Sequence, residues 1–216
     1  MMKRLLFVML SLVLQSVQAQ KKGDLQLGFS TGLNISSVSN PDIETNQNVD
    51  SKKGLNAGVS AEYFILNHWS LKGKLIYDQK GLQGNYFRKP IDQASGYVFR
   101  EYNSDFEMNY LTVPLSLQWH FVEKVDFGIG VGGYAGLLLD SNDNEHQFFG
   151  NRRQFSKTDF GAIGSLTIKY PLTNNFKIGF EYEFQQGFSD LYSPNNTSDK
   201  HLNSRQSFNI CCFYSI

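Results

Sequence analysis

The sequence has 216 residues and balances 20 basic against 20 acidic side chains. A chain of this length suits a single domain, and its balanced charge argues against a protein that binds nucleic acid. No segment approaches the roughly 20 continuous apolar residues of a transmembrane helix.

The N-terminus predicts export. Lys3 and Arg4 precede a short apolar stretch, and Ala19 ends the small-residue pattern after which a signal peptidase cuts. The apolar stretch is too short to span a bilayer as a helix. We therefore predict a signal peptide over residues 1–19 and an outer-membrane β-barrel domain over residues 20–216.

Eight runs of alternating apolar and polar residues follow in chain order, with the period of a β-strand that has one apolar face. The runs cover residues 24–36, 54–65, 69–80, 107–121, 125–139, 158–170, 176–188 and 205–216. Short turns are predicted near 66–68, 122–124 and 171–175, and long polar loops over 37–53, 82–106, 140–157 and 189–204. This asymmetry is typical of bacterial outer-membrane barrels. We predict an all-β fold: an eight-stranded antiparallel up-and-down transmembrane β-barrel with short periplasmic turns and long extracellular loops.

Each run has one apolar face and one face of small or charged residues. In the first run Leu25, Leu27 and Phe29 alternate with Gln26 and Gly28. Alternation alone leaves two solutions, a soluble lipocalin-like barrel with the apolar face inside and a membrane barrel with that face outside. The interior of an eight-stranded barrel is only just wide enough for side chains to fill, so it cannot hold several large apolar residues from every strand. We therefore expect the apolar face to contact lipid and predict an outer-membrane location.

Aromatic residues are predicted to form two girdles at the membrane interfaces. Near the short turns the candidates are Tyr63, Trp69, Trp119, Phe121, Tyr170 and Phe176. At the opposite interface they are Tyr77, Phe106, Phe184 and Phe188.

Charges on the polar face are predicted to form a network inside the barrel. If residues 66–68 form a three-residue turn, Glu62 faces Lys72 and Ser60 faces Lys74. The inward candidates, five of each sign, are Glu62, Lys72, Lys74, Asp78, Lys80, Asp159, Lys169, Lys177, Glu181 and Glu183. Because buried charges must be paired to be tolerated, this balance favours a structural, salt-bridged plug. The alternative is a ring of charge that selects ions in a pore.

No catalytic site, metal site or cofactor is predicted. The four histidines are dispersed over a turn, a strand end and two loops, and we interpret them as solvated: His68, His120, His146 and His201. An acid/base or nucleophilic enzyme needs a base placed against a partner. We therefore expect a protein that is not an enzyme.

Four short stretches resemble the PorT-like outer-membrane β-barrel family of Bacteroidota. They are residues 75–81 (LIYDQKG), 109–115 (NYLTVPL), 130–138 (GVGGYAGLL) and 159–161 (DFG). The resemblance extends over essentially the whole mature chain and implies a membrane barrel without a catalytic motif. The family's named member is similar to an assembly factor for a secretion and gliding apparatus.

The leading hypothesis for function is a small non-enzymatic barrel with a structural, interaction or assembly role through its extracellular loops. The loops carry aromatic and arginine residues of the kind enriched in binding hot spots: Tyr86, Phe87, Arg88, Tyr97, Phe99, Arg100, Phe148, Phe149, Arg152 and Arg153. These residues fit equally well a role in packing the loops against each other and lipopolysaccharide. Expected partners are outer-membrane lipid and lipopolysaccharide, with a protein partner at the loops and no nucleic acid. The alternative is a narrow channel for small solutes or ions.

Overall fold

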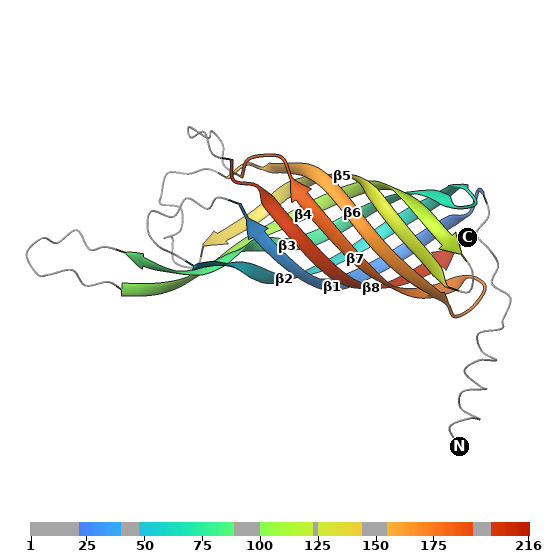
Figure 1. Ribbon diagram of the computed structural model, residues 1–216, viewed down its shortest axis with the longest axis horizontal. Helices are drawn as coiled ribbons and strands as arrows, with labels where there is room; N and C mark the ends of the chain where they lie inside the picture. Colours follow the sequence, from blue (N-terminus) through green and yellow to red (C-terminus); the bar gives the residue numbers. More distant parts are fainter. Residues whose placement is uncertain (1–21, 40–47, 89–99, 123–124, 144–154, 192–199) are drawn as a thin grey trace, which may run out of the picture.

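Eight β-strands close into a barrel in which each strand pairs with its neighbours in sequence and β1 pairs with β8 (Figure 1). The computed structural model describes residues 22–39, 48–88, 100–122, 125–143, 155–191 and 200–216. The strands are β1 Leu25–Val38, β2 Asn48–Leu66, β3 Trp69–Arg88, β4 Arg100–Val122, β5 Asp126–Asp143, β6 Thr158–Pro171, β7 Phe176–Gly187 and β8 Asn203–Ser215. All neighbouring pairs are antiparallel, so the predicted fold is confirmed. Within the described ranges, no helix is long and apolar enough to cross a membrane.

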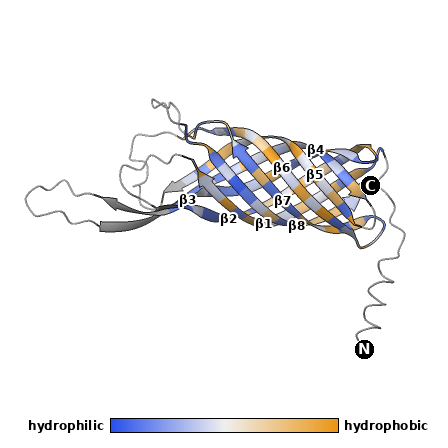
Figure 2. Cartoon of the chain, in the orientation of Figure 1, coloured by the Kyte–Doolittle hydropathy of each residue, from blue (hydrophilic) through white to orange (hydrophobic). Residues whose placement is uncertain are grey.

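The alternation of the sequence sets the two faces of the barrel wall. In β1 the side chain of Phe29 is 53% exposed on the outside, whereas Ser30 is 6% exposed. In β4 Leu115 and Ser116 show the same contrast, at 55% and 6%. Hydrophobic and hydrophilic residues alternate along the strands in Figure 2. Because the large apolar side chains face outward, the soluble alternative, which places them inside, is wrong.

Several strands extend further than predicted at one end of the barrel, and β2, β3 and β4 do so by the most residues. β2 begins at Asn48, inside the predicted loop 37–53. β3 and β4 extend into the predicted loop 82–106, where residues 82–88 pair with 100–106. The outer part of this pairing, residues 84–88 with 100–104, is called the β3–β4 ribbon and projects beyond the barrel (Figure 1). Apolar alternation marks only the segments of a strand that face lipid, so it could not reveal a ribbon that leaves the barrel.

The opposite end, at which β2 joins β3 and β6 joins β7, is called the short-turn end below. Asn67 and His68 join β2 to β3, and Leu66 pairs with Trp69. A register shift just before Leu66 marks a β-bulge. The predicted three-residue turn is therefore a two-residue turn beside a bulge.

The register of β2 against β3 is the predicted one. Glu62 faces Lys72, and Ser60 faces Lys74. These pairs determine which side chains enter the lumen at the same height. They do not determine which charges bind each other.

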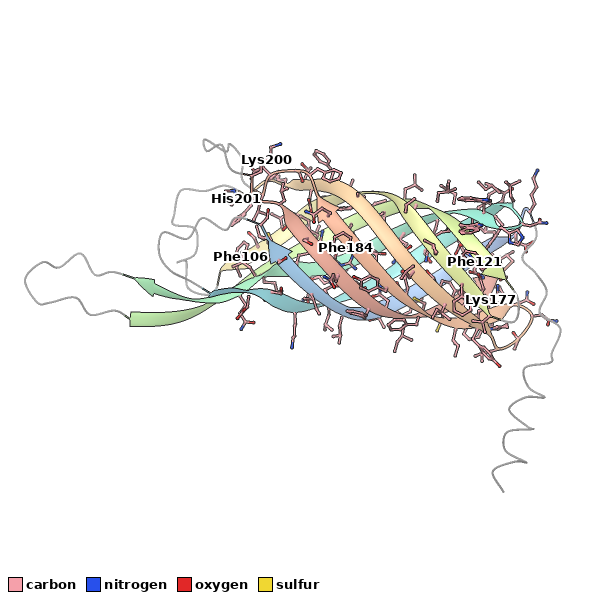
Figure 3. The ribbon with its side chains drawn as sticks, in the orientation of Figure 1. Phe106, Phe121, Lys177, Phe184, Lys200 and His201 are labelled. Carbon is pink, nitrogen blue, oxygen red and sulfur yellow. The ribbon has the colours of Figure 1, made fainter. Side chains whose placement is uncertain are left out.

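Aromatic side chains gather on the outside of the short-turn end. Trp69 stacks on Trp119 with 6.2 Å between ring centroids, and the ring of Phe121 lies 3.9 Å from that of Trp119. Figure 3 places Phe121 at this end of the barrel and Phe184 further along it. These rings are exposed on the lipid-facing side, as predicted.

Phe106 is a correction to the predicted aromatic girdles. Its side chain is fully buried in an apolar cluster inside the barrel. The reason is its position in β4, where it shares the inward parity of Met108 and Tyr110. The predicted run begins at residue 107, so its alternation does not extend to Phe106.

Gly81 lies where two strands of the barrel wall pack too closely for a side chain. Its φ is +149°, and a Cβ there would lie 2.0 Å from the carbonyl oxygen of Phe106 and 2.9 Å from Lys52 Cδ. The Gly81 N–H donates to Ser36 Oγ at 2.9 Å. Lys52 runs beside Gly81 and pairs with Glu107 at 3.3 Å. Backbone conformation and packing therefore both require glycine.

Candidate functional site

The inward faces of the strands fill the lumen with charged side chains. In the described part of the barrel, the buried Asp and Glu residues are Glu62, Asp78, Asp126, Asp159, Glu181 and Glu183, and the buried Lys and Arg residues are Lys52, Lys72, Lys74, Lys80, Lys169, Lys177 and Arg205. Most of them belong to three groups along the barrel axis. The mouth cluster, at the short-turn end, is Glu62, Ser70, His120, Asp126 and Lys169; the central network is Lys72, Lys74, Asp78, Glu181, Glu183 and Arg205; the outer layer is Lys80, Tyr110, Tyr134 and Asp159.

The central network joins strands on opposite sides of the barrel. Lys74 Nζ on β3 lies 2.6 Å from Glu181 Oε1 and 2.8 Å from Glu183 Oε2 on β7. Lys72 also pairs with Glu181. In this ring of eight strands, three strands separate β3 from β7 on either side. The ion pairs therefore span the full width of the lumen.

Arg205 connects this network to a third carboxylate. Its Nη1 lies 2.6 Å from Glu183 Oε1, and its Nε lies 3.0 Å from Asp78 Oδ1. Asn34 donates to Asp78 at 2.6 Å and accepts from Arg205 at 3.1 Å. The guanidinium therefore has opposite charges on two sides, which is what a fully buried arginine requires.

Glu62 is the hub of the mouth cluster. Lys169 Nζ lies 2.7 Å from Glu62 Oε2. The other carboxylate oxygen accepts from Ser70 Oγ at 2.6 Å and lies 2.8 Å from His120 Nε2. Since β2 and β6 are also opposite each other in the ring, the Glu62–Lys169 pair crosses the lumen as well.

His120 is buried between two carboxylates. Its Nδ1 lies 2.9 Å from Asp126 Oδ1, and its Nε2 faces Glu62 and Ser70. With 1% of its side chain exposed, His120 is not solvated, and that interpretation is wrong. The sequence could have placed His120 inside the barrel, because it lies two residues after the inward Gln118 in β4 and alternation puts both on the same face.

The remaining histidines differ from one another. His68 is exposed in the β2–β3 turn, as expected. His201 is buried, with Nδ1 3.6 Å from Asp190 Oδ1, so its interpretation as solvated is wrong. His146 lies outside the described residues.

Across the residues that the structure describes, no three His, Cys, Asp or Glu side chains form a group that could hold a metal ion.

Ser70, His120 and Asp126 have the spacing of a Ser-His-Asp triad, which the sequence did not reveal. Ser70 Oγ lies 2.9 Å from His120 Nε2, and Asp126 lies 2.9 Å from Nδ1. However, the Ser70 hydroxyl donates to Glu62, and Ser70 is fully buried. A serine nucleophile must give its proton to the histidine and reach a substrate. The geometry therefore fits a structural cluster better than a catalytic one.

In the outer layer, Lys80 lies between two tyrosine rings. Its Nζ is 5.0 Å from the ring centroid of Tyr110 and 4.8 Å from that of Tyr134, within cation–π range. It pairs with Asp159 at 3.1 Å, and the Tyr134 hydroxyl donates to the same carboxylate at 3.2 Å. Each of these four residues comes from a different one of the four stretches that carry the family resemblance. The fold therefore brings those stretches together in one layer.

An apolar cluster lies beyond the outer layer, towards the β3–β4 ribbon. Its buried members are Val38, Leu82, Phe106, Met108, Tyr110 and Leu191, with Leu138 and Phe155 packed against them. Phe106 stacks on Phe155 with 4.9 Å between ring centroids. Leu191 comes from the connection between β7 and β8, so part of that connection folds into the barrel.

The sequence matches the family described as "Outer membrane protein beta-barrel domain" over residues 18–193. The chain belongs to this family. A comparison with curated proteins gives no match. The protein is thus a small outer-membrane barrel, located in the outer membrane as predicted.

Two solved structures are similar to this outer-membrane barrel. OprG from Pseudomonas aeruginosa has a TM-score of 0.56 at 13% identity, covering 93% of this chain and 99% of that chain. AlkL, determined in DMPC lipid bilayers, has a TM-score of 0.52 at 16% identity, covering 94% of each chain. At these identities the likeness shows the fold alone.

The structure places all ten candidate lumen residues of this outer-membrane barrel on the inward face, each 8% exposed or less. Nine of them form ion pairs with opposite charges. Lys177 also points inward, at the short-turn end (Figure 3), but no ion pair within the described ranges includes it. Glu62 and Lys72, which face each other in register, bind Lys169 and Glu181 instead.

Three charged residues and one histidine on the inward faces of the described strands were not among the ten candidates: Lys52, Asp126, Arg205 and His120. Each lies at or just beyond the end of a predicted strand. Their parity could have identified them, because Arg205 alternates with the outward Gln206 just as Ser207 does with Phe208.

Proposed function

We propose that this outer-membrane barrel is a non-enzymatic protein with a structural or assembly role, in which the barrel supports extracellular segments that bind a partner. The observation that carries the proposal is the set of ion pairs between opposite strands, β3 to β7 and β2 to β6. Such cross-links favour a closed and rigid support. The near balance of positive and negative charges in the lumen also argues against an ion-selective pore, because such a pore uses a ring of charges of one sign.

In this proposal the short-turn end faces the periplasm and the ribbon end faces outward. Short periplasmic turns are the rule in this class of barrel. Among the candidate binding residues, Tyr86, Phe87, Arg88 and Arg100 belong to the β3–β4 ribbon. The others, Tyr97, Phe99, Phe148, Phe149, Arg152 and Arg153, lie outside the described residues. We propose lipopolysaccharide and a protein as the partners at this end.

The PorT-like resemblance supports an assembly role. Its four stretches supply the outer layer of the lumen, with Lys80 between Tyr110 and Tyr134. The resemblance therefore concerns how the barrel is built. It does not identify a particular partner.

The mouth cluster supports the absence of enzymatic activity. Ser70 donates to Glu62, and the same carboxylate oxygen contacts His120. This arrangement leaves the histidine no free nitrogen with which to accept the serine proton. We therefore propose that the cluster serves the stability of the barrel.

Photo-crosslinking in intact cells tests the interaction role. A photoreactive amino acid at Tyr86 probes the ribbon, and the same amino acid at Asn67 is the matched control in the opposite turn. We expect a discrete crosslinked product at position 86 that position 67 does not give. The same products at both positions, or none at either, would contradict an interaction through the ribbon end.

A further inference from the structure

His120 is the member of the mouth cluster whose charge ordinarily changes near neutral pH. The ring is almost fully buried, and it packs against Phe64 with 5.0 Å between ring centroids. Its charge state therefore determines what its neighbours can do, because bulk water does not replace a lost contact.

Both ring nitrogens face carboxylates. Nδ1 lies 2.9 Å from Asp126 Oδ1, and Nε2 lies 2.8 Å from Glu62 Oε1. An ionised carboxylate only accepts hydrogen bonds, and a neutral imidazole has only one N–H. The two contacts are satisfied together only when both nitrogens carry hydrogen. The geometry thus selects the imidazolium form.

The other charged groups around the ring are cations, which oppose a charged His120, so the two carboxylates must outweigh them. Lys169 from β6 lies 2.7 Å from Glu62 Oε2 and 3.9 Å from Asp126 Oδ2. Lys177 from β7 is inward at the same end without an ion pair in the described ranges.

From β3, Ser70 faces the ring. Lys72 lies two residues further along β3 and is paired with Glu181. From β1, Gln26 accepts from Lys169 at 2.7 Å. From the β2–β3 turn, His68 Nδ1 lies 3.1 Å from the backbone carbonyl oxygen of His120 and does not contact the ring's carboxylates. Lys169 thus lies near both carboxylates, and a charged His120 is a cation in direct contact with each of them.

We propose that His120 is a pH-sensitive latch at the short-turn end of the barrel, which ties β4 to β2 and β5 while its ring is doubly protonated. When the ring loses a proton, either Glu62 or Asp126 loses the hydrogen bond that His120 donates to it, and losing a charge-assisted hydrogen bond at a buried site is costly. The stabilisation is therefore present while folded His120 is charged, and it is lost as the pH rises through its titration. The latch does not depend on the proposed interaction role.

Nitrogen-15 NMR of histidine-labelled wild-type protein tests the charge state directly. His120→Gln identifies the signals by their disappearance. At about pH 6, near the ordinary titration range of histidine, we expect both ring nitrogens of His120 to be protonated. An unprotonated Nε2 in the folded protein would overturn the latch, and the protonation state is read from the wild type itself.

Thermal unfolding in lipid vesicles tests the consequence. The wild-type midpoint should fall as the pH rises from about 6 to about 9, across the range in which histidine loses its charge. Glu183→Gln, a change in the central network away from His120, should retain that fall, whereas His120→Gln should lose it. The same fall in His120→Gln as in the wild type would contradict the proposal.

A serine-reactive fluorophosphonate probe separates the latch from a catalytic arrangement. The latch predicts no labelling of folded protein, because a charged His120 cannot accept the Ser70 proton. Labelling that disappears in Ser70→Ala would overturn the proposal, since it requires a neutral His120. This outcome would also contradict the absence of enzymatic activity, whereas failure of the pH experiment alone would not.

Discussion

Lys74 on β3 and Glu183 on β7 form an ion pair of 2.8 Å across the width of the barrel. Arg205 reaches the same carboxylate from β8 at 2.6 Å. The number of strands and their register set the diameter of the closed sheet. The ion pairs join its opposite sides to each other through the lumen. The apolar outer face contributes burial in lipid.

Removing one partner of the central network should destabilise the barrel strongly. Glu183→Gln leaves Lys74 and Arg205 buried with a neutral neighbour, and we expect a loss of about 3 to 5 kcal/mol in the free energy of unfolding. Urea unfolding in lipid vesicles measures it. Glu107→Gln is the matched control, because the Glu107 side chain is 35% exposed, and it should cost clearly less. Equal losses would mean that the central network contributes no more to the free energy of unfolding than the partly exposed Lys52–Glu107 pair.

An arginine on the lipid-facing side should be costly. Leu115 is 55% exposed on the outside of β4, and Leu115→Arg should cost about 2 to 4 kcal/mol near the middle of the membrane. Asn67→Arg, in the exposed β2–β3 turn, should cost close to nothing. The same vesicle assay compares them, and similar values would show that the outer face does not meet lipid.

Gly81→Ala should destabilise the barrel more than Gly23→Ala. Both glycines have positive φ, so both substitutions add backbone strain, on the order of 1 to 3 kcal/mol. A Cβ on Gly81 also meets the Phe106 carbonyl at 2.0 Å, whereas a Cβ on Gly23 meets nothing within 4 Å. Unfolding midpoints of the two variants separate packing from strain. A larger loss of stability at Gly23 would contradict the claim that close packing requires glycine at position 81.

The predicted signal peptide is tested by the N-terminus of the mature protein. Mass spectrometry of protein extracted from outer membranes should find a chain that begins near Gln20. Ala19→Arg should block cleavage, because the site needs a small residue there, and should leave the precursor intact. A membrane-inserted wild type that retains Lys3 and Arg4 would contradict the prediction.

The sequence predicted the fold well because a period of two determines which face of a strand a residue occupies. Leu115 and Ser116 could be assigned to opposite faces from alternation alone. The turn between Leu66 and Trp69 then fixed the register that places Glu62 opposite Lys72. Face and register together place a side chain in the lumen at a known height.

The sequence could not predict the partners of these charges. A side chain in the lumen can reach any strand at its height, and alternation says nothing about direction around the ring. Glu62 thus binds Lys169 from the opposite side instead of the lysine that it faces. Ser70, His120 and Asp126 lie on the adjacent strands β3, β4 and β5, and they converge because of the register of β4 against both neighbours, which alternation alone does not give.

Planar-bilayer recording of the purified wild-type protein tests most directly the claim that its charges close the lumen. If ion pairs such as Lys74–Glu183 span the barrel, the wild type should insert without steady conductance, and Glu183→Gln should show at most irregular openings as it loses stability. Stable, charge-selective conductance in the wild type, with a selectivity that Glu183→Gln changes while the unfolding midpoint stays the same, would contradict the claim and favour a channel.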